Sequence, residues 1–264
     1  MTLFALSGVS YSVPRRQLID GLDLELEPGV VTALVGRNGS GKSTLLRLLA
    51  GQARPSAGSI AYHGRALSDW RRQELARDLA YLPQVTPPAE GMQLGELVAL
   101  GRYPWRGALG RLRSEDRQAI ASAVARCGVS HLTERLVDTL SGGERQRGWI
   151  AMMLAQGART LLLDEPISAL DVAHQVEVLG LVHNMCRETG LSAVIVLHDV
   201  NMAARYCDRV VALGGGKLLL NGPISHLMTP GALMQVYGLP MTVALQDGDA
   251  FALPRNKRIC KEKP

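Results

Sequence analysis

Residues 36–43 read GRNGSGKS, and this stretch decides the fold. It follows the apolar run 29–35 (GVVTALV), which is rich in β-branched residues, so we expect a buried strand there. Residues 44–49 are mostly good helix formers. A strand, a glycine-rich loop and a helix in this order match the phosphate-binding pattern GxxxxGK[ST]. The stretch therefore predicts a site for the phosphates of a nucleotide at the start of a helix.

The residues of this loop have separate expected tasks. Glycines let backbone N–H groups approach the phosphates, and the helix N-terminus adds a positive potential. Lys42 is expected to bridge the β- and γ-phosphates of ATP, and the Ser43 hydroxyl to hold Mg²⁺, which takes few protein ligands. The predicted nucleotide-binding residues of the segment are Gly36, Asn38, Gly39, Ser40, Gly41, Lys42, Ser43 and Thr44.

A second apolar run, residues 160–163 (TLLL), leads directly into two adjacent carboxylates, Asp164 and Glu165. Ligands bind at the carboxyl ends of parallel strands in open α/β sheets. We expect Asp164 to take part in the Mg²⁺ shell and Glu165 to orient or deprotonate the attacking water as general base. Acidic pairs at strand ends also serve as helix caps. The apolar strand before this pair, together with the phosphate loop, favours the catalytic interpretation.

The composition limits the classes of protein that remain. The 264 residues are 47% apolar, which is enough for one substantial core with a smaller lobe inserted into it. Apolar runs stay below the roughly 18 residues of a membrane span, and the first residues lack the basic leader of a signal peptide. Four cysteines without CxxC pairing suit neither a disulfide framework nor a zinc site, and favour a reducing cytoplasm.

The formal net charge of +5 raises the question of nucleic acid or an anionic membrane surface as partner. We interpret the terminal basic cluster as a solvated tail and expect no nucleic-acid partner. The cluster consists of Arg255, Lys257, Arg258, Lys261 and Lys263.

Residues 140–144 (LSGGE) open a stretch of mostly helical periodicity that ends near Gly157. Ser141 and Glu144 have the spacing of a capping box, which is the simpler interpretation. Two glycines and a serine hydroxyl at a helix start also make an anion site. The residues by themselves leave both interpretations open.

An LSGGE segment between a phosphate loop and a DEP strand end resembles the signature motif of ABC-transporter ATPases, and the resemblance covers nearly the whole chain. It implies that Tyr11 stacks on adenine. It implies that Gln84 is the residue of the glutamine loop, which takes part in catalysis and helps to hold the Mg²⁺ ion. It also implies that His198 is the switch histidine, which contacts the γ-phosphate. Residues 168–171 (SALD) resemble the dimer-contact loop of the family.

The resemblance implies an α/β fold: a P-loop NTPase with a RecA-like core, an antiparallel β-subdomain and an inserted α-helical signature subdomain. We predict an ATP-binding domain at residues 1–240. Its core would comprise residues 1–84 and 157–240, and its helical subdomain about residues 85–156. Residues 241–264 are expected to be a C-terminal tail with a flexible basic end.

The resemblance also implies partners. Two copies would form a homodimer packed head to tail, with each ATP between the phosphate loop of one subunit and signature residues of the other. The residues expected to act across this dimer are Ser141, Gly142, Gly143 and Asp171. Integral membrane permease subunits, and indirectly a substrate-binding protein, complete the assembly at the cytoplasmic face of a bacterial inner membrane. Gln84 would be the hinge of the helical subdomain, and Tyr103 and Trp105 would face a short helix of the permease.

Residues 100–105 (LGRYPW) and 196–208 are similar to the importers of iron chelates, haem and vitamin B12, and most similar to ferric-hydroxamate uptake ATPases. We therefore expect the chain to energise import of an iron(III)–siderophore complex, with haem or vitamin B12 as the alternative cargo. Ile167 departs from the family, which usually has threonine there.

Three non-transport alternatives within the superfamily fit the sequence less well. A translation-type relative would ordinarily carry two phosphate loops in one chain, and only one is present here. A chromosome or repair ATPase needs a long coiled coil between Lys42 and Ser141, and that interval is too short here. A nucleotide-binding scaffold without catalysis would be expected to lack Glu165 or His198, and both are present.

Overall fold

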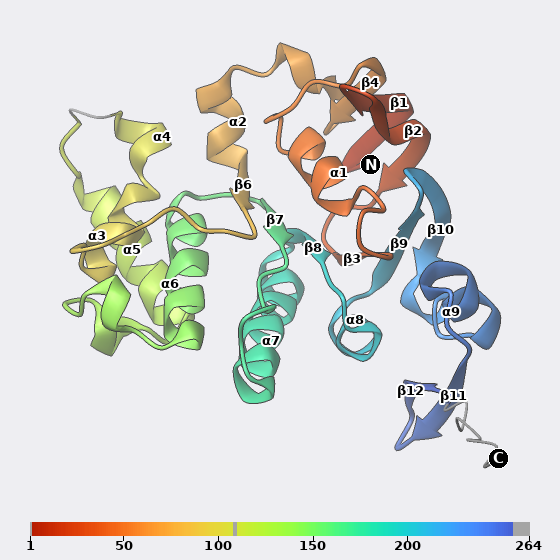
Figure 1. Ribbon diagram of the computed structural model, residues 1–264. Helices are drawn as coiled ribbons and strands as arrows, with labels where there is room; N and C mark the ends of the chain where they lie inside the picture. The colour runs from red at the N-terminus through yellow and green to blue at the C-terminus, as the bar shows by residue number, and fades with distance from the viewer. Residues whose placement is uncertain (1, 108–109, 256–264) are drawn as a thin grey trace.

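A six-stranded sheet forms the centre of the computed structural model, which describes residues 2–107 and 110–255 (Figure 1). The strand order is β10-β9-β3-β8-β7-β6, and all neighbours are parallel except β10 and β9. The strands are β3 (Val31–Val35), β6 (Leu79–Leu82), β7 (Thr160–Asp164), β8 (Ser192–Val196), β9 (Arg209–Gly214) and β10 (Lys217–Pro223). β3, β7 and β8 are buried along their whole length, as their continuous apolar sequences predict.

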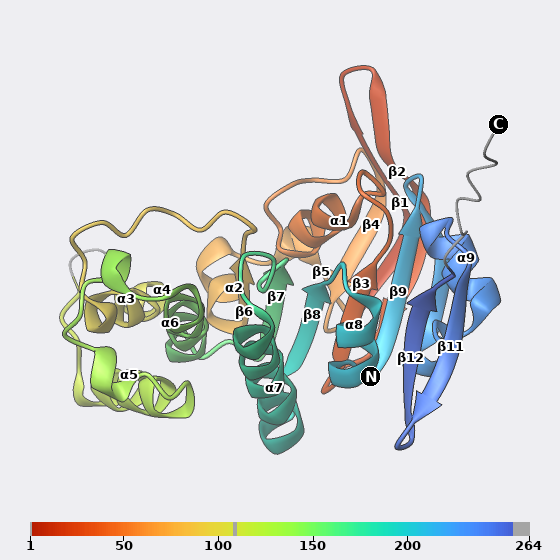
Figure 2. The same cartoon turned by 60° about the horizontal axis from the view of Figure 1, so that its bottom comes forward.

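An antiparallel sheet of order β2-β1-β4-β5 lies beside the central sheet. Its strands are β1 (Phe4–Val13), β2 (Arg16–Leu26), β4 (Ala57–Tyr62) and β5 (Arg65–Ala66). One apolar core joins this sheet to helix α1 (Lys42–Leu49) and to one face of the central sheet, with Phe4, Leu46 and Val196 all fully buried in it. Figure 2 shows the β1–β2 hairpin extending past the rest of the molecule. The predicted RecA-like core and antiparallel β-subdomain are confirmed.

Helices lie on the other side of the central sheet and beyond its β6 edge. Those on the other side are α7 (Val172–Thr189), α8 (Val200–Tyr206) and α9 (Pro230–Tyr237), whereas α2 (Arg72–Asp78) lies on the α1 side, where Leu75 packs against the core described above. A separate group, here called the helical lobe, consists of α3 (Leu94–Leu100), α4 (Tyr103–Arg106), α5 (Ser114–Arg126) and α6 (Gly142–Ala155) (Figure 1). Short 3₁₀ turns occur at Leu67–Asp69, Ser130–Leu132, Val137–Thr139 and Ile224–His226. Across residues 2–107 and 110–255, the helices are too short or too polar to span a membrane.

A buried carboxylate ties the helical lobe together. Asp116, fully buried on α5, accepts hydrogen bonds from Arg102 Nε at 2.8 Å and from the Arg113 backbone N–H at 2.8 Å, and also pairs with Arg106. The Arg106 guanidinium, aided by the other two donors, holds the pKa of Asp116 far below its usual range. Two charged donors and a backbone donor thus keep this carboxylate ionised inside the lobe.

The two aromatics of α4 have different surroundings. Trp105 donates its Nε1–H to the Gln156 carbonyl at 2.7 Å, and the guanidinium groups of Arg77 and Arg102 lie over its ring. Trp105 is therefore anchored within the protein by a hydrogen bond and cation–π contacts. Tyr103 is 60% exposed, Leu100 49% and Trp105 39%, so these three form the accessible apolar surface of the lobe at this point.

The C-terminal residues that the structure describes form a hairpin. β11 (Met241–Gln246) and β12 (Asp249–Pro254) pair antiparallel, and Asn201 of α8 exchanges two hydrogen bonds with Ala252, at 2.8 and 3.3 Å. The sequence had indicated only a tail from residue 241 onward, so its first part differs from that expectation. The reason is that a side chain over 50 residues upstream holds the strand. Apart from Arg255, the predicted flexible basic end lies outside the described residues.

Candidate active site

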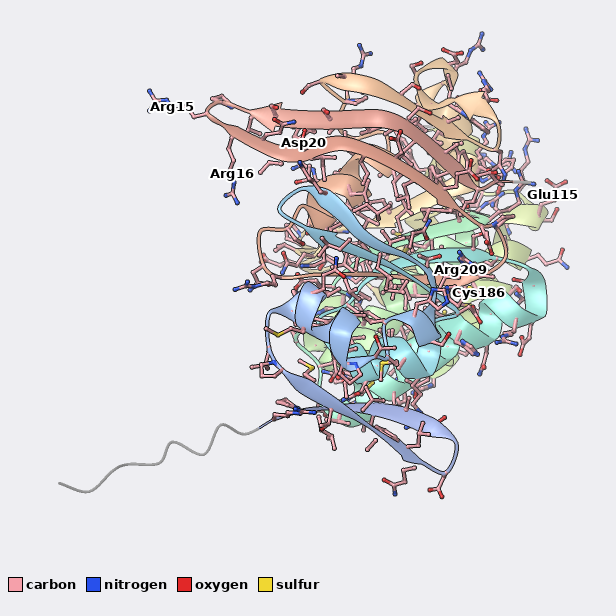
Figure 3. All side chains as sticks on the ribbon, turned by 90° about the vertical axis from the view of Figure 1, so that its right-hand side faces the viewer. Arg15, Arg16, Asp20, Glu115, Cys186 and Arg209 are labelled. Atoms are coloured by element: carbon pink, nitrogen blue, oxygen red, sulfur yellow. The ribbon has the colours of Figure 1, made fainter. Side chains whose placement is uncertain are left out.

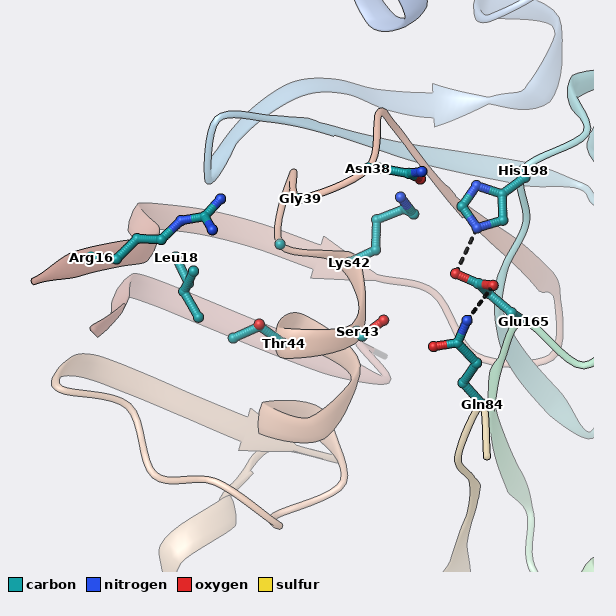
Figure 4. A pocket seen from close by; sticks show the side chains of 11 residues that line it. Arg16, Leu18, Asn38, Gly39, Lys42, Ser43, Thr44, Gln84, Glu165 and His198 are labelled. Atoms are coloured by element: carbon teal, nitrogen blue, oxygen red, sulfur yellow. Dashed lines mark hydrogen bonds and ion pairs between the residues drawn. The ribbon is translucent and has the colours of Figure 1, made fainter. Parts of the chain in front are cut away.

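The phosphate loop opens into a cleft of about 370 Å³ at the carboxyl ends of the central strands (Figure 4). The cleft brings together residues from five separate parts of the sequence. Its lining consists of Arg16, Leu18, Asn38, Gly39, Gly41, Lys42, Ser43, Thr44, Gln84, Glu165 and His198.

Two glycines of the loop are required by their neighbours. Gly36 has φ 141°, and a Cβ there would lie 2.2 Å from the Leu213 carbonyl oxygen of β9. Gly41 has φ 104°, and a Cβ there would lie 2.7 Å from the Leu18 carbonyl oxygen of β2. The loop is thus enclosed between two strands, and only glycine fits at these positions.

Lys42 points along the inside of the loop. Its Nζ donates to the carbonyl oxygens of Gly36 at 2.8 Å and Arg37 at 3.1 Å. Burial lowers the pKa of Lys42, and the negative charges of Glu165 and Asp164 oppose that shift. The loop therefore concentrates a positive charge beside two carboxylates.

Asp164 and Ser43 form the pair of hard oxygen donors that the sequence predicted for Mg²⁺. Ser43 Oγ donates to Asp164 Oδ1 at 3.0 Å, although the two residues are 121 positions apart. Burial raises the pKa of Asp164, and the charge of Glu165 adds to this, while Ser43 and Lys42 oppose it. No group of three or more His, Cys, Asp or Glu side chains suited to a metal occurs in the part of the chain that the structure describes. One hydroxyl and one carboxylate fit an ion that keeps most of its ligands as phosphate and water.

Glu165 lies between the two other predicted catalytic residues. His198 Nε2 is 2.6 Å from Glu165 Oε1, and Gln84 Nε2 donates to Glu165 Oε2 at 2.7 Å (Figure 4). The three residues follow β7, β8 and β6, which are neighbours in the sheet, so their side chains meet at one edge. Glu165 has φ 50°, a conformation that non-glycine residues seldom adopt and that is concentrated at functional sites. Both carboxylate oxygens are therefore held in place.

Ser141 begins α6 as predicted. Its Oγ accepts the Glu144 backbone N–H at 3.3 Å, and Glu144 Oε2 accepts the Ser141 backbone N–H at 2.8 Å. The capping box is confirmed. The second interpretation, an anion site at the same helix start, remains open because the two hydrogen bonds use only some of the terminal N–H groups.

The signature residues pack against the start of α7, away from the lining of the cleft. A Cβ on Gly143 would lie 2.2 Å from His174 Cδ2, and one on Gly142 would lie 3.0 Å from Leu170 Cδ2. Asp171 Oδ1 accepts the His174 backbone N–H at 2.9 Å and lies 2.8 Å from the ring Nδ1. The residues expected to act across a dimer thus lie together, and Ser141, Gly142, Gly143 and Asp171 all lie outside the cleft lining.

This packing leads to a prediction for Gly143→Ala. The added methyl group overlaps the His174 ring, which Asp171 holds, so we expect a destabilisation of about 1–3 kcal/mol together with reduced ATPase activity. Thermal unfolding and phosphate release measure the two effects. In the double variant Gly143→Ala/His174→Ala, both losses should shrink, because the overlapping ring is gone. Losses equal to or greater than those of Gly143→Ala alone would show that His174 is not the cause.

Three sequence predictions need comment. Tyr11 lies in β1 opposite Ile19 and packs against the core of the antiparallel sheet, but it does not line the cleft. Gly36 and Ser40 belong to the loop without lining the cleft. Arg16 and Leu18 line it, although no motif in the sequence marks them as site residues. The only available signal was their place in a strand that runs towards the phosphate loop.

Ile167, the departure from the family pattern, is buried in the main core. The loop that follows it is held through backbone atoms. Gln175 Nε2 donates to the carbonyl oxygens of Leu170 at 2.9 Å and of Ile167 at 3.4 Å. The loop contacts therefore do not depend on a hydroxyl at position 167.

Comparisons with known proteins give one consistent result. A family model described as ABC transporter matches residues 19–168. The iron(3+)-hydroxamate import ATP-binding protein FhuC of Bacillus subtilis is 39% identical over 96% of this chain and 91% of its own length. The hemin import ATP-binding protein HmuV of Streptomyces coelicolor is 44% identical over 91% of this chain and 85% of its own length. A chain of an ABC transporter described as of the metal-chelate type, solved in an inward-facing conformation, superposes with a TM-score of 0.84 at 26% identity, covering 97% of this chain and 99% of that one.

Proposed function

The chain belongs to the ABC transporter family as an ATP-hydrolysing subunit, and we propose that it energises import of an iron(III)–siderophore complex, of the hydroxamate type, through separate permease subunits. The observation that carries the ATPase chemistry is the Glu165 carboxylate, held by His198 and Gln84 beside the phosphate loop. The hydroxamate cargo is supported by the relative FhuC, which matches nearly the whole chain.

Glu165 acts as the general base in this proposal. Its carboxylate orients the attacking water and takes up its proton, while His198 contacts the γ-phosphate and Gln84 positions the carboxylate. The hydrogen bond from Gln84 and the close contact with His198 support these roles, because they fix each carboxylate oxygen in a separate direction. Lys42 bridges the β- and γ-phosphates once ATP draws it away from the loop carbonyls.

The remaining loop residues bind the polyphosphate through backbone N–H groups and hydroxyls. They are Gly36, Asn38, Gly39, Ser40, Gly41, Ser43 and Thr44. Mg²⁺ neutralises charge on the phosphates when bound, and Ser43, Asp164 and Gln84 are the residues that would hold it. The direct contact between Ser43 and Asp164 supports this assignment. Tyr11 stacks on the adenine at the edge of the antiparallel sheet.

Two copies of the chain share each nucleotide in this proposal. Ser141, Gly142, Gly143 and Asp171 of one copy complete the site of the other. Their common location, outside the cleft of their own chain, supports action in trans. ATP then joins two surfaces that each lack part of the site, and hydrolysis separates them.

The helical lobe transmits this motion to the permease. We assign residues 1–84 and 157–240 to the core, about 85–156 to the helical subdomain with Gln84 as its hinge, and 241–264 to a C-terminal segment. The exposed side chains of Leu100 and Tyr103 offer an apolar contact for a short permease helix. The subunit therefore lies at the cytoplasmic face of the bacterial inner membrane, and a substrate-binding protein takes part only through the permease.

Uptake of radiolabelled iron bound to a hydroxamate siderophore tests the proposal. Cells lacking this protein should lose uptake, and wild type but not Glu165→Gln should restore it. Parallel measurements with haem and vitamin B12 decide between cargoes. The relative HmuV favours haem as second candidate, since its identity is 44%. Normal hydroxamate uptake with a haem defect would overturn the hydroxamate assignment and keep the transport ATPase.

A further inference from the structure

An arginine from the antiparallel sheet reaches the phosphate loop. Arg16 is the first residue of β2, at the end of the β1–β2 hairpin, and its side chain extends towards Gly39 over the mouth of the cleft (Figure 4). Its Nη2 lies 3.3 Å from the position that a Cβ on Gly39 would occupy. A guanidinium is therefore in reach of an anion bound by the loop.

The Arg16 side chain is available for such an anion. None of the ion pairs formed among residues 2–107 and 110–255 includes it. Its neighbour Arg15 has the same charge but points away from the body of the molecule (Figure 3). Arg15 has φ 68°, a turn conformation that separates the directions of the two side chains. The chain thus offers one arginine over the cleft and one in solvent.

The cleft has two chemically different ends. Glu165, His198 and Gln84 are at one end, and Arg16 and Leu18 are at the other, with the phosphate loop between them (Figure 4). In the function proposed above, on which this inference rests, the γ-phosphate must face Glu165. The triphosphate then runs along the loop, and its α-phosphate comes to the end where Arg16 is.

We propose that the Arg16 guanidinium binds the α-phosphate of the nucleotide, so that the β1–β2 hairpin contributes directly to nucleotide affinity. Guanidinium groups recognise phosphate oxygens through charge-assisted hydrogen bonds of fixed geometry. The loop supplies backbone N–H groups and Lys42 near the reacting end, and Arg16 supplies the charge at the other end. The contact does not change during hydrolysis, because ATP and ADP both keep the α-phosphate.

The test is a titration of the purified full-length chain with fluorescent ATP and ADP analogues, without Mg²⁺ so that turnover does not interfere. Arg16→Ala should weaken the binding of both nucleotides by about tenfold, which is the loss of affinity expected for one charge-assisted contact. Arg16→Lys, which keeps the charge but loses the fork of donors, should fall between wild type and Arg16→Ala. Arg15→Ala is the matched control and should change affinity by less than about twofold, since its charge is largely screened at physiological ionic strength.

Equal effects of Arg15→Ala and Arg16→Ala would overturn the proposal, because they would indicate only the general charge of the hairpin. A loss of affinity for ATP but not for ADP would also overturn the proposal, since this result would place Arg16 at the γ-phosphate. Lys42→Ala separates this inference from the function on which it rests. If Lys42→Ala weakens binding and Arg16→Ala does not, only the Arg16 contact is wrong. If Lys42→Ala binds like wild type, the nucleotide site itself is wrong and both proposals fail.

Discussion

A Glu165→Gln variant is expected to bind ATP as wild type does and to hydrolyse it at least about 10²-fold more slowly, since general-base catalysis contributes about 10²–10⁴-fold. The amide keeps the shape of the side chain, so the contacts with His198 and Gln84 can be kept while the basic oxygen is lost. Phosphate release under saturating ATP measures the loss. Because hydrolysis is blocked after binding, the variant should also accumulate as a closed dimer in size-exclusion chromatography with ATP and Mg²⁺.

Two controls make the result specific. The nucleotide titration without Mg²⁺ should give the wild-type affinity, which excludes a general disturbance of the cleft. The melting temperature should stay close to that of wild type or rise, because φ 50° at Glu165 is equally unfavourable for glutamine. Turnover equal to that of wild type would remove Glu165 from its role as base.

A Ser141→Phe variant is expected to lose about 10²–10³-fold in turnover, the range found when a preorganised donor to a reacting oxygen is removed. The proposed reason is that Ser141 contacts the γ-phosphate held by the partner subunit. The same substitution also removes the cap of α6, which costs about 1 kcal/mol of stability. Ser141→Asp keeps a good capping residue but places a negative charge at the γ-phosphate, so it should be folded and still inactive.

Mixing Ser141→Phe with Lys42→Ala tests whether the site is shared. In a mixed dimer, one site has both defects, and the other combines an intact Lys42 with an intact Ser141. Partial recovery of ATPase activity is therefore expected from two inactive proteins. Absence of any recovery, with both variants folded and mixed dimers present, would contradict the head-to-tail arrangement.

The sequence indicated most of the candidate site residues because these residues follow buried strands. The phosphate loop after β3 and the carboxylates at the end of β7 were identified from an apolar run followed by polar residues, whereas His198, which follows β8, was assigned from the family resemblance. Parallel strands bring such residues to one edge. The sequence could not give the order of strands in the sheet, and it is this order that places Glu165 between His198 and Gln84.

Other features could not be predicted because they depend on the direction of single side chains. Nothing in the adjacent pair Arg15 and Arg16 shows which one faces the cleft, since the turn geometry decides it. Trp105 was expected at a docking surface and is 39% exposed, but its hydrogen bond to Gln156 and the two arginines over its ring could not be predicted. The C-terminal hairpin depends on Asn201, far upstream in the sequence, so no local pattern indicates it.

The close packing of Gly143 on His174 has an evolutionary consequence. A Cβ at position 143 would overlap the His174 ring at 2.2 Å, so a larger residue at 143 costs less stability once the side chain at 174 has become smaller. In the reverse order, the intermediate carries the overlap between the larger residue at 143 and the His174 ring. The two positions are therefore subject to epistasis, and the order of substitutions at them is constrained in any lineage that keeps transport active.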